Sequence, residues 1–235
     1  MLLGMAIALP ATPAAASVVA KVELGTAEQF GVLAGSAVTN TGPTVVGSAG
    51  DTVGLDVGVS PGPVAISGFP PGLVVPPGVL HPEAGGAVAQ AQADATTAFD
   101  QAAGLPADSV GLTDLAGKVL QPGVYQGNLS LTGTVVLDNS TDPNAVFVFQ
   151  ASSTLITASS SVVRFTNSNH ASCNVFWQVG SSATLGSNST FVGTIDALTA
   201  ITAETGATIQ GRLIARNAAV TLDDNTITRA PCAVA

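Results

Sequence analysis

Few side chains in this sequence are able to perform acid–base or metal chemistry. The two histidines, His81 and His170, stand far apart in segments typical of loops, whereas a zinc site or a nucleophilic triad needs several such groups at one point. We expect both histidines to be solvated. Asp51 and Asp56 could line a calcium site, but two carboxylates are few for this ion, so turn or cap roles are favoured.

The remaining carboxylates bear on whether the chain could be a polysaccharide-cleaving enzyme. Such an enzyme needs carboxylates clustered on neighbouring strands, either to hold Ca²⁺ or to act on the sugar. Asp196 is expected in register with Gln178 and Ala215, and Asp223 and Asp224 are adjacent in a predicted turn, where Asp is common. The sequence therefore predicts no catalytic residue, no metal site and no cofactor.

Threonine is the residue type that recurs at a regular spacing. A first series repeats at an almost constant interval in the runs Ser181-Ser182-Ala183-Thr184, Thr199-Ala200-Ile201-Thr202 and Ala218-Ala219-Val220-Thr221. A second series repeats at the same interval at Thr190, Thr208 and Thr226. Similar runs occur earlier in the chain, at Ser36-Ala37-Val38-Thr39 and Thr154-Leu155-Ile156-Thr157 for the first series and at Thr44 for the second. Hydroxyl groups repeated in this way suit a repetitive partner surface better than a reaction.

The repeat length indicates the architecture that carries these threonines. A period of about 18 residues, with β-prone runs separated by Gly, Asn and Ser, is what three short strands per coil of a parallel β-helix require. We therefore predict one mostly β domain of triangular cross-section. Because strand side chains alternate between faces, Ile201 should point inward and Thr202 outward. Of the neighbours Phe176 and Trp177, one should fill the core and the other should lie under a helix or at an edge.

One segment has helical periodicity instead. Small and apolar residues recur at helical spacing after Pro82. Proline is suited to the first turn of a helix, and Gly104 is suited to the position where the helix ends. We predict an amphipathic helix over about 82–103 that packs along one side of the solenoid. The preceding segment, residues 59–78, is rich in Pro and Gly and is expected to form a loop or an end cap that blocks sheet edges.

Charge, cysteines and the N-terminal segment bear on partners and location. The formal net charge is −9, with six Lys and Arg among 235 residues, so the basic surface that attracts nucleic acid or anionic lipid is lacking. We predict that residues 1–16 are a signal peptide, with cleavage after Ala20 as the alternative, and that residues 17–235 form a secreted, monomeric domain. In an oxidising compartment Cys173 and Cys232 are expected to form a disulfide, with two free buried thiols as the alternative.

Several longer stretches carry a family likeness between about Glu28 and Cys232. They are EQFGVLAGSAVTNTG, LDVGVSPG, GVYQGNLSLTGTVVLD, NAVFVFQASSTLITAS, NVFWQVGSSATLGSNSTFVGTI and TGATIQGRLIARNAAVTLDDNTIT. On these stretches the chain resembles the bacterial and fungal ice-binding (antifreeze) proteins of the DUF3494 family. The resemblance implies an irregular right-handed parallel β-helix of triangular section with one long α-helix packed alongside. It also implies an exported protein whose partner is an ice surface.

The resemblance places the candidate site on the first threonine series. Ice-facing strands of the family carry a Thr-Ala/Gly-x-Thr/Asn pattern, which the run from Thr199 to Thr202 matches completely. Leu155 is expected to add bulk to this face, and the second series is expected to be structural, with Arg212 as a large neighbour. The candidate ice-binding residues are Ser36, Ala37, Thr39, Thr154, Thr157, Ser181, Ser182, Thr184, Thr199, Ala200, Thr202, Ala219 and Thr221.

A second function class would use the same flat solenoid. A secreted or cell-surface adhesin, or a structural module, could bind polysaccharide or cells through it. Ice binding is favoured because outward threonines would form a grid, with neighbouring strands about 4.7–4.9 Å apart and same-face residues about 6.6 Å apart along a strand. Many weak contacts from such a grid add up on a crystal surface.

Overall fold

The computed structural model describes residues 19–63, 65–167 and 171–232. The predicted signal peptide and His170 therefore lie outside the described residues. The helices are η1 (Gly25–Gln29), α1 (Ala87–Gly104) and η2 (Ser172–Asn174). The strands are β1 (Phe30–Ala34), β2 (Val38–Thr41), β3 (Val45–Val46), β4 (Asp56–Val59), β5 (Ile66–Ser67), β6 (Leu73–Val74), β7 (Ser109–Asp114), β8 (Val119–Leu120), β9 (Gly123–Leu131), β10 (Thr134–Leu137), β11 (Phe147–Ala151), β12 (Leu155–Thr157), β13 (Val162–Phe165), β14 (Val175–Val179), β15 (Ala183–Leu185), β16 (Thr190–Ala197), β17 (Ile201–Ala203), β18 (Thr208–Ala215), β19 (Val220–Asp223) and β20 (Thr226–Thr228).

The strands stack in parallel to form a solenoid with three sides. Side A contains, in spatial order, β5, β2, β19, β17, β15, β12 and the ends of β9 and β7. Side B contains β6, β3, β20, the starts of β18 and β16, β13, β10 and β8. Side C contains β4, β1, the ends of β18 and β16, β14, β11 and the start of β9. The predicted β-solenoid fold is confirmed.

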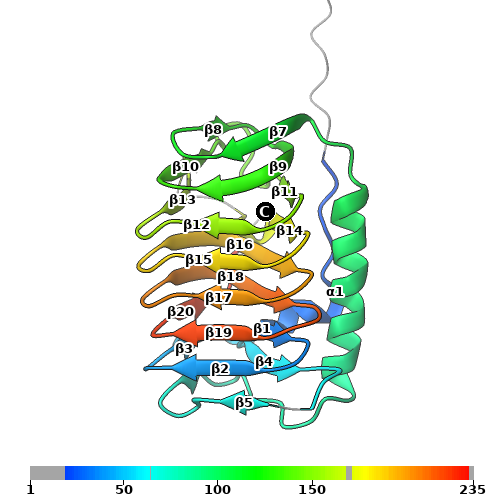
Figure 1. Ribbon diagram of the computed structural model, residues 1–235, viewed down its shortest axis with the longest axis vertical. Helices are drawn as coiled ribbons and strands as arrows, with labels where there is room; N and C mark the ends of the chain where they lie inside the picture. The colour runs from blue at the N-terminus through cyan, green and yellow to red at the C-terminus, as the bar shows by residue number, and fades with distance from the viewer. Residues whose placement is uncertain (1–18, 64, 168–170, 233–235) are drawn as a thin grey trace, which may run out of the picture.

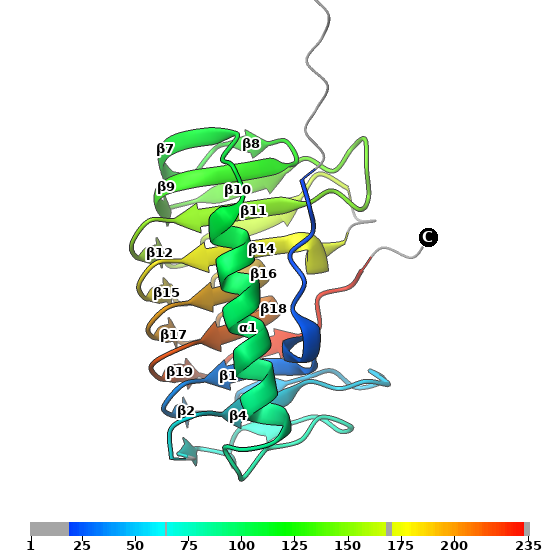
Figure 2. The same ribbon diagram turned by 90° about the vertical axis from the view of Figure 1, so that its right-hand side faces the viewer.

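The chain builds this stack of strands in two passes, one before α1 and one after it. β1–β6 form the coils at one end, and α1 then runs along side C to the opposite end, where β7 begins (Figures 1 and 2). The remaining strands wind back toward the first coils until β18, β19 and β20 pair with β1, β2 and β3. A seam therefore joins the last coil of the chain to its first.

Two apolar cores result from this arrangement. One fills the inside of the solenoid, where the Phe149 and Trp177 rings stack with centroids 3.8 Å apart. The other lies between side C and the covering segments, and it includes Phe176 together with Val88 and Ala95 of α1. The prediction that Phe176 and Trp177 face opposite ways, one into the core and one under the helix, is confirmed.

The helix begins later than predicted but ends at the expected glycine. It spans Ala87–Gly104, because the backbone of Gly86 has φ 57° and is not helical. Its buried stripe is rich in alanine, which allows close packing on the sheet. At its C-terminal end the Gln150 side-chain amide on β11 donates to the carbonyls of Ala102 and Leu105, both at 2.8 Å. The Ala102 carbonyl also accepts from the Leu105 amide at 3.3 Å, so Gln150 adds side-chain partners at the helix end, where carbonyls lack partners within the helix.

The Pro- and Gly-rich segment forms the end of the stack, as predicted, but it contains two short strands. β5 pairs with β2 through Val38 and Ile66, and β6 pairs with β3 through Val45 and Leu73. Each strand has two residues. A short edge strand offers few unpaired backbone groups to another chain, which limits edge-to-edge association.

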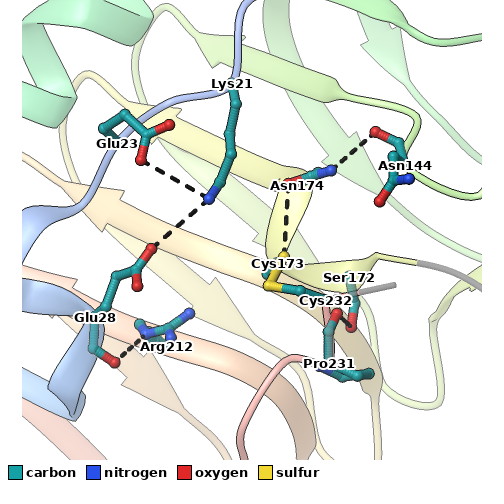
Figure 3. Close-up of a disulfide and its surroundings, with 10 residues drawn as sticks. All are labelled: Lys21, Glu23, Glu28, Asn144, Ser172, Cys173, Asn174, Arg212, Pro231 and Cys232. Atoms are coloured by element: carbon teal, nitrogen blue, oxygen red, sulfur yellow. Dashed lines mark hydrogen bonds and ion pairs between the residues drawn. A yellow bond between two sulfur atoms is a disulfide. The ribbon is translucent and has the colours of Figure 1, made fainter. Parts of the chain in front are cut away.

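The predicted disulfide is confirmed. Cys173 in η2 is bonded to Cys232 in the C-terminal segment, with 5.3 Å between their Cα atoms (Figure 3). The Cys173 amide also donates to the Pro231 carbonyl at 3.2 Å. The chain after β20 is therefore fixed to the coil that contains β14.

Candidate functional site

Four threonines stack in consecutive coils on side A. Thr184 pairs with Thr202, Thr202 with Thr221, and Thr221 with Thr39. The residue before each of them is buried in the solenoid core, namely Ala183, Ile201, Val220 and Val38. Because strand side chains alternate, the four threonines point outward in one straight column.

Small side chains flank this column. The Val220 amide donates to the Ala37 carbonyl at 2.9 Å, and the Ile201 amide donates to the Ala219 carbonyl at 3.0 Å. The same pattern continues to Ala200, so alanines lie one above another beside the threonine column. In the next coil Ser182 takes the position of these alanines, and its hydroxyl donates to the Thr199 hydroxyl at 3.1 Å. Side A, whose stacked strands lie at the front of Figure 1, therefore carries hydroxyl groups in rows from the coil of Thr39 to that of Thr184.

One predicted member of the site, Thr157, does not lie on this surface. Leu155 pairs with Ala183 and Ile156 with Thr184, so the run is shifted by one residue from the predicted alignment. Thr157 is buried and its hydroxyl accepts a hydrogen bond from the Gly186 amide at 3.0 Å. Since a shift of one residue exchanges the two faces of a strand, the prediction for Thr157 was wrong.

The same shift corrects the prediction for Leu155. Its side chain fills the solenoid core with no exposed surface, so it adds no bulk to side A. Ile156, which the sequence analysis did not single out, takes the outward position and is 54% exposed. Thr154 lies on side A, one coil beyond Ser182, and is exposed.

The second threonine series lies on side B. Thr190, Thr208 and Thr226 are in register and exposed. Thr44 was aligned with them wrongly, because Val45 occupies that position and Thr44 is buried, its hydroxyl accepting from the Asn225 amide at 3.0 Å.

Arg212 is likewise absent from side B. The strand turns the corner at Gly211, so Arg212 is buried on side C and donates from Nε to the Glu28 carbonyl at 3.0 Å (Figure 3). The prediction that Arg212 roughens side B was therefore wrong. The exposed Arg164 on β13 does place a charge there.

Two carboxylates lie at the ends of side A strands, Glu204 directly after β17 and Asp223 as the last residue of β19. Glu204 accepts hydrogen bonds from the amide and the hydroxyl of Ser187, at 3.1 and 3.0 Å. Asp223 accepts one from the Thr205 hydroxyl. In both cases a carboxylate of one coil is bonded to a hydroxyl of the adjacent coil, so these charges tie neighbouring turns together.

The titratable side chains Asp51, Asp56 and His81, which lie away from side A, make hydrogen bonds that stabilise the fold. Asp51 accepts from the Val53 amide at 3.0 Å, and this bond holds the pKa of the Asp51 carboxyl below its ordinary value. His81 was predicted to be solvated, but its Nε2 lies 2.8 Å from Oδ2 of the buried Asp56. Within residues 19–63, 65–167 and 171–232, no group of three or more His, Cys, Asp or Glu could hold a metal ion.

Asp196 is the most unusual carboxyl. It is fully buried under α1, and neither of its oxygens has a hydrogen-bond partner among the described residues. Burial raises the pKa of Asp196 well above its ordinary value, against the opposing charge of Arg216. Its predicted register with Gln178 is confirmed, whereas its partner on β18 is Ile214 and not Ala215.

The fold and the site define a class of protein. It is a parallel β-solenoid in which one side is a flat array of threonine, serine and alanine and another side is covered by an α-helix. A family model described as Ice-binding-like matches residues 32–228, and the chain belongs to this family. The family is not an enzyme family.

Relatives agree with this assignment. A protein called "Ice-binding protein" from Nostoc sp. (strain HG1) is 49% identical over 212 residues, which cover 88% of this chain and 74% of the relative. The crystal structure of an ice-binding protein from the Antarctic ascomycete Antarctomyces psychrotrophicus matches with a TM-score of 0.80 and 40% identity, over 90% of this chain and 100% of that one.

A second solved structure, of an ice-binding protein from an Antarctic biological consortium, matches with a TM-score of 0.82 and 40% identity, over 93% of this chain and 96% of that one. None of these three relatives supports the alternative prediction of an adhesin. As a separate finding, no helix among the described residues is long and apolar enough to cross a membrane.

Proposed function

We propose that this protein binds ice crystals through side A and thereby inhibits ice growth and recrystallisation. The observation that carries the proposal is the unbroken column of Thr39, Thr221, Thr202 and Thr184, with alanines lying beside it. The proposed contact residues are Ser36, Ala37, Thr39, Ser181, Ser182, Thr184, Thr199, Ala200, Thr202, Ala219 and Thr221. Thr154 lies one coil further along the same side.

The chemistry of threonine supports this function. Each outward residue presents a methyl group, which disfavours random hydration, beside a hydroxyl group, which anchors a water molecule. The backbone sets a fixed spacing of about 4.7–4.9 Å between neighbouring strands. Such a grid holds water in a regular layer that can merge with a crystal face.

Rigidity supports it further. Each side chain of the array contributes a weak contact, but the strands hold all of them in place before binding. Little conformational entropy is therefore lost on adsorption. Because a crystal surface is extended and immobile, many contacts engage at once and their effects add up.

We further propose that the protein acts without catalysis, metal or cofactor, as a secreted monomer with no nucleic-acid or membrane partner. In this proposal residues 1–16 are a signal peptide and residues 17–235 a single domain. The Cys173–Cys232 disulfide supports export to an oxidising compartment. The net charge of −9 disfavours nucleic acid and anionic lipid.

Slow growth of ice from a dilute solution of the purified protein tests the proposal. The protein should be enriched in the ice fraction relative to the liquid, and it should stop the coarsening of a polycrystalline film. The variant Thr202→Tyr, which places a ring at the centre of the threonine column, is the control and should stay largely in the liquid. A folded sample that partitions into the liquid and leaves crystal coarsening unchanged would overturn ice binding.

A further inference from the structure

The column of outward side chains on side A continues past Thr184, but its chemistry changes there. Ile156 is paired with Thr184 on one side and with Ser130 on the other. Its side chain is 54% exposed, among the most exposed large apolar side chains of the described residues. A regular row of threonines thus meets an aliphatic side chain at the third coil from the β7 end of side A.

Ile156 differs from threonine in two ways that matter on a flat array. Both residues are β-branched and both carry a γ-methyl group, so they suit the same strand position. Isoleucine replaces the hydroxyl by an ethyl arm, which extends further from the strand and offers no hydrogen bond to water. At this coil the outward side chain therefore projects further from the strand, and the hydroxyl group that would anchor a water molecule is missing.

The surface beside Ile156 is also uneven. A hollow of about 380 Å³ opens there, lined by Asn128, Leu129, Ser130, Ser153, Thr154 and Ile156. Between Thr39 and Thr184, by contrast, alanines and hydroxyls lie one above another in each coil. A projecting side chain next to a hollow cannot lie in the plane that the four threonines define.

We propose that Ile156 sets the limit of the ice-contacting array, which therefore ends at Thr184. Thr154, although exposed on the same side, lies beyond that limit and contributes little in the natural protein. Replacing Ile156 by threonine extends the array by one coil and brings Thr154 into contact. This inference rests on the proposed function of side A.

The substitution Ile156→Thr tests the inference through a gain rather than a loss. The concentration that half-maximally inhibits ice recrystallisation should fall about two- to tenfold, the size expected for one additional net hydrogen bond. Ile156→Val, which shortens the side chain without adding a hydroxyl, should give a smaller gain. Both variants should unfold at the same temperature as the parent, because the position is exposed.

Val119→Thr is the matched control. Val119 is β-branched and 62% exposed, and it pairs with Val136 on side B. An exposed aliphatic side chain is thus again replaced by threonine, but away from the array, and activity should be unchanged. If the parent binds ice while Ile156→Thr does so equally or less well, or if Val119→Thr gives the same gain, the inference is overturned and the proposed function stands. If the parent itself does not bind ice, the proposed function fails first.

Discussion

The hydroxyl oxygens of Thr39 and Thr221 lie 3.4 Å apart, although 182 residues separate them in the chain. Thr39 belongs to the first coil and Thr221 to the last, and their strands pair across the seam. The threonine column is therefore continuous only because the end of the chain docks on its beginning. The proposed site is shared between the two passes of the chain.

Thr39→Tyr should accordingly weaken ice adsorption as severely as a change within the C-terminal coils. A ring projecting from the seam would hold the flat surface away from the crystal on both sides. Thr39 is exposed, so the free energy of unfolding should change by no more than about 0.5 kcal/mol. Partition into slowly grown ice measures the effect.

Thr226→Tyr provides the control at the same seam, because Thr226 pairs with Val45 on side B. It should adsorb like the parent. Normal adsorption of Thr39→Tyr would show that the first coil does not contribute to the array.

The sequence was sufficient to predict the array where the repeat is uniform. Thr184, Thr202 and Thr221 follow one another at the nearly constant interval of the repeat, and their alignment is confirmed. Ile156 and Thr184 are separated by well over one repeat length, so the period could not set their register. In the run from Thr154 to Thr157, either Leu155 or Ile156 could point into the core. The register is set by the preceding strands, where Ala151 pairs with Val179, so that four residues further on Leu155 pairs with Ala183.

Other features depend on contacts that a repeat does not encode. The corner at Gly211 turns Arg212 from side B to side C. The paired glycines Gly193 and Gly211 mark this corner in the sequence, but they do not say toward which side the next side chain turns. His81 and Asp56 meet because the end coil folds back on β4, where the His81 amide donates to the Val57 carbonyl at 2.9 Å. Pairing of that kind follows from the complete fold.

Removing the disulfide should destabilise the protein without altering side A. The bond closes a loop with a sequence separation of 59 residues, for which the chain-entropy estimate is roughly 4 kcal/mol. Replacing Cys173 and Cys232 together by alanine should lower the free energy of unfolding by an amount of this order, measured in urea. Ice adsorption at low temperature should persist. An unchanged urea midpoint would show that the bond contributes little to folding.

Gly211→Ala should be strongly destabilising. A Cβ atom at this corner would lie 1.8 Å from the carbonyl oxygen of Gly193 in the adjacent coil, so the backbones would have to separate. We expect a loss of at least about 3 kcal/mol in the free energy of unfolding. Gly104→Ala at the end of α1 is the control, since a Cβ there meets nothing within 4 Å, and it should be neutral or slightly stabilising. Equal stability of the two variants would contradict close packing at the corner.

Stability should depend on pH through Asp196. Because its pKa is raised in the folded protein by burial, the folded state binds this proton more tightly than the unfolded state. The resulting stability is fully present below the ordinary value of 3.8 and is lost as the pH rises through the raised value. Each unit of pKa difference corresponds to about 1.4 kcal/mol.

Asp196→Asn cannot ionise, so its stability relative to the parent should increase as the pH is raised from 4 toward 8. Urea unfolding of both proteins at several pH values measures this. A constant difference between them across that range would show that Asp196 does not carry the pH dependence.

The central claim, that side A binds ice, is tested most directly by comparing Thr202→Tyr with Thr208→Tyr. Thr202 lies within the column between Thr184 and Thr221, and Thr208 is the exposed threonine of side B between Thr190 and Thr226. Both variants should fold with a change in stability of no more than about 0.5 kcal/mol. The measurement is the fraction of each protein taken up by slowly growing ice. We predict that uptake of Thr202→Tyr falls sharply while Thr208→Tyr is taken up like the parent; loss of uptake in Thr208→Tyr with normal uptake in Thr202→Tyr would contradict the assignment of the site to side A.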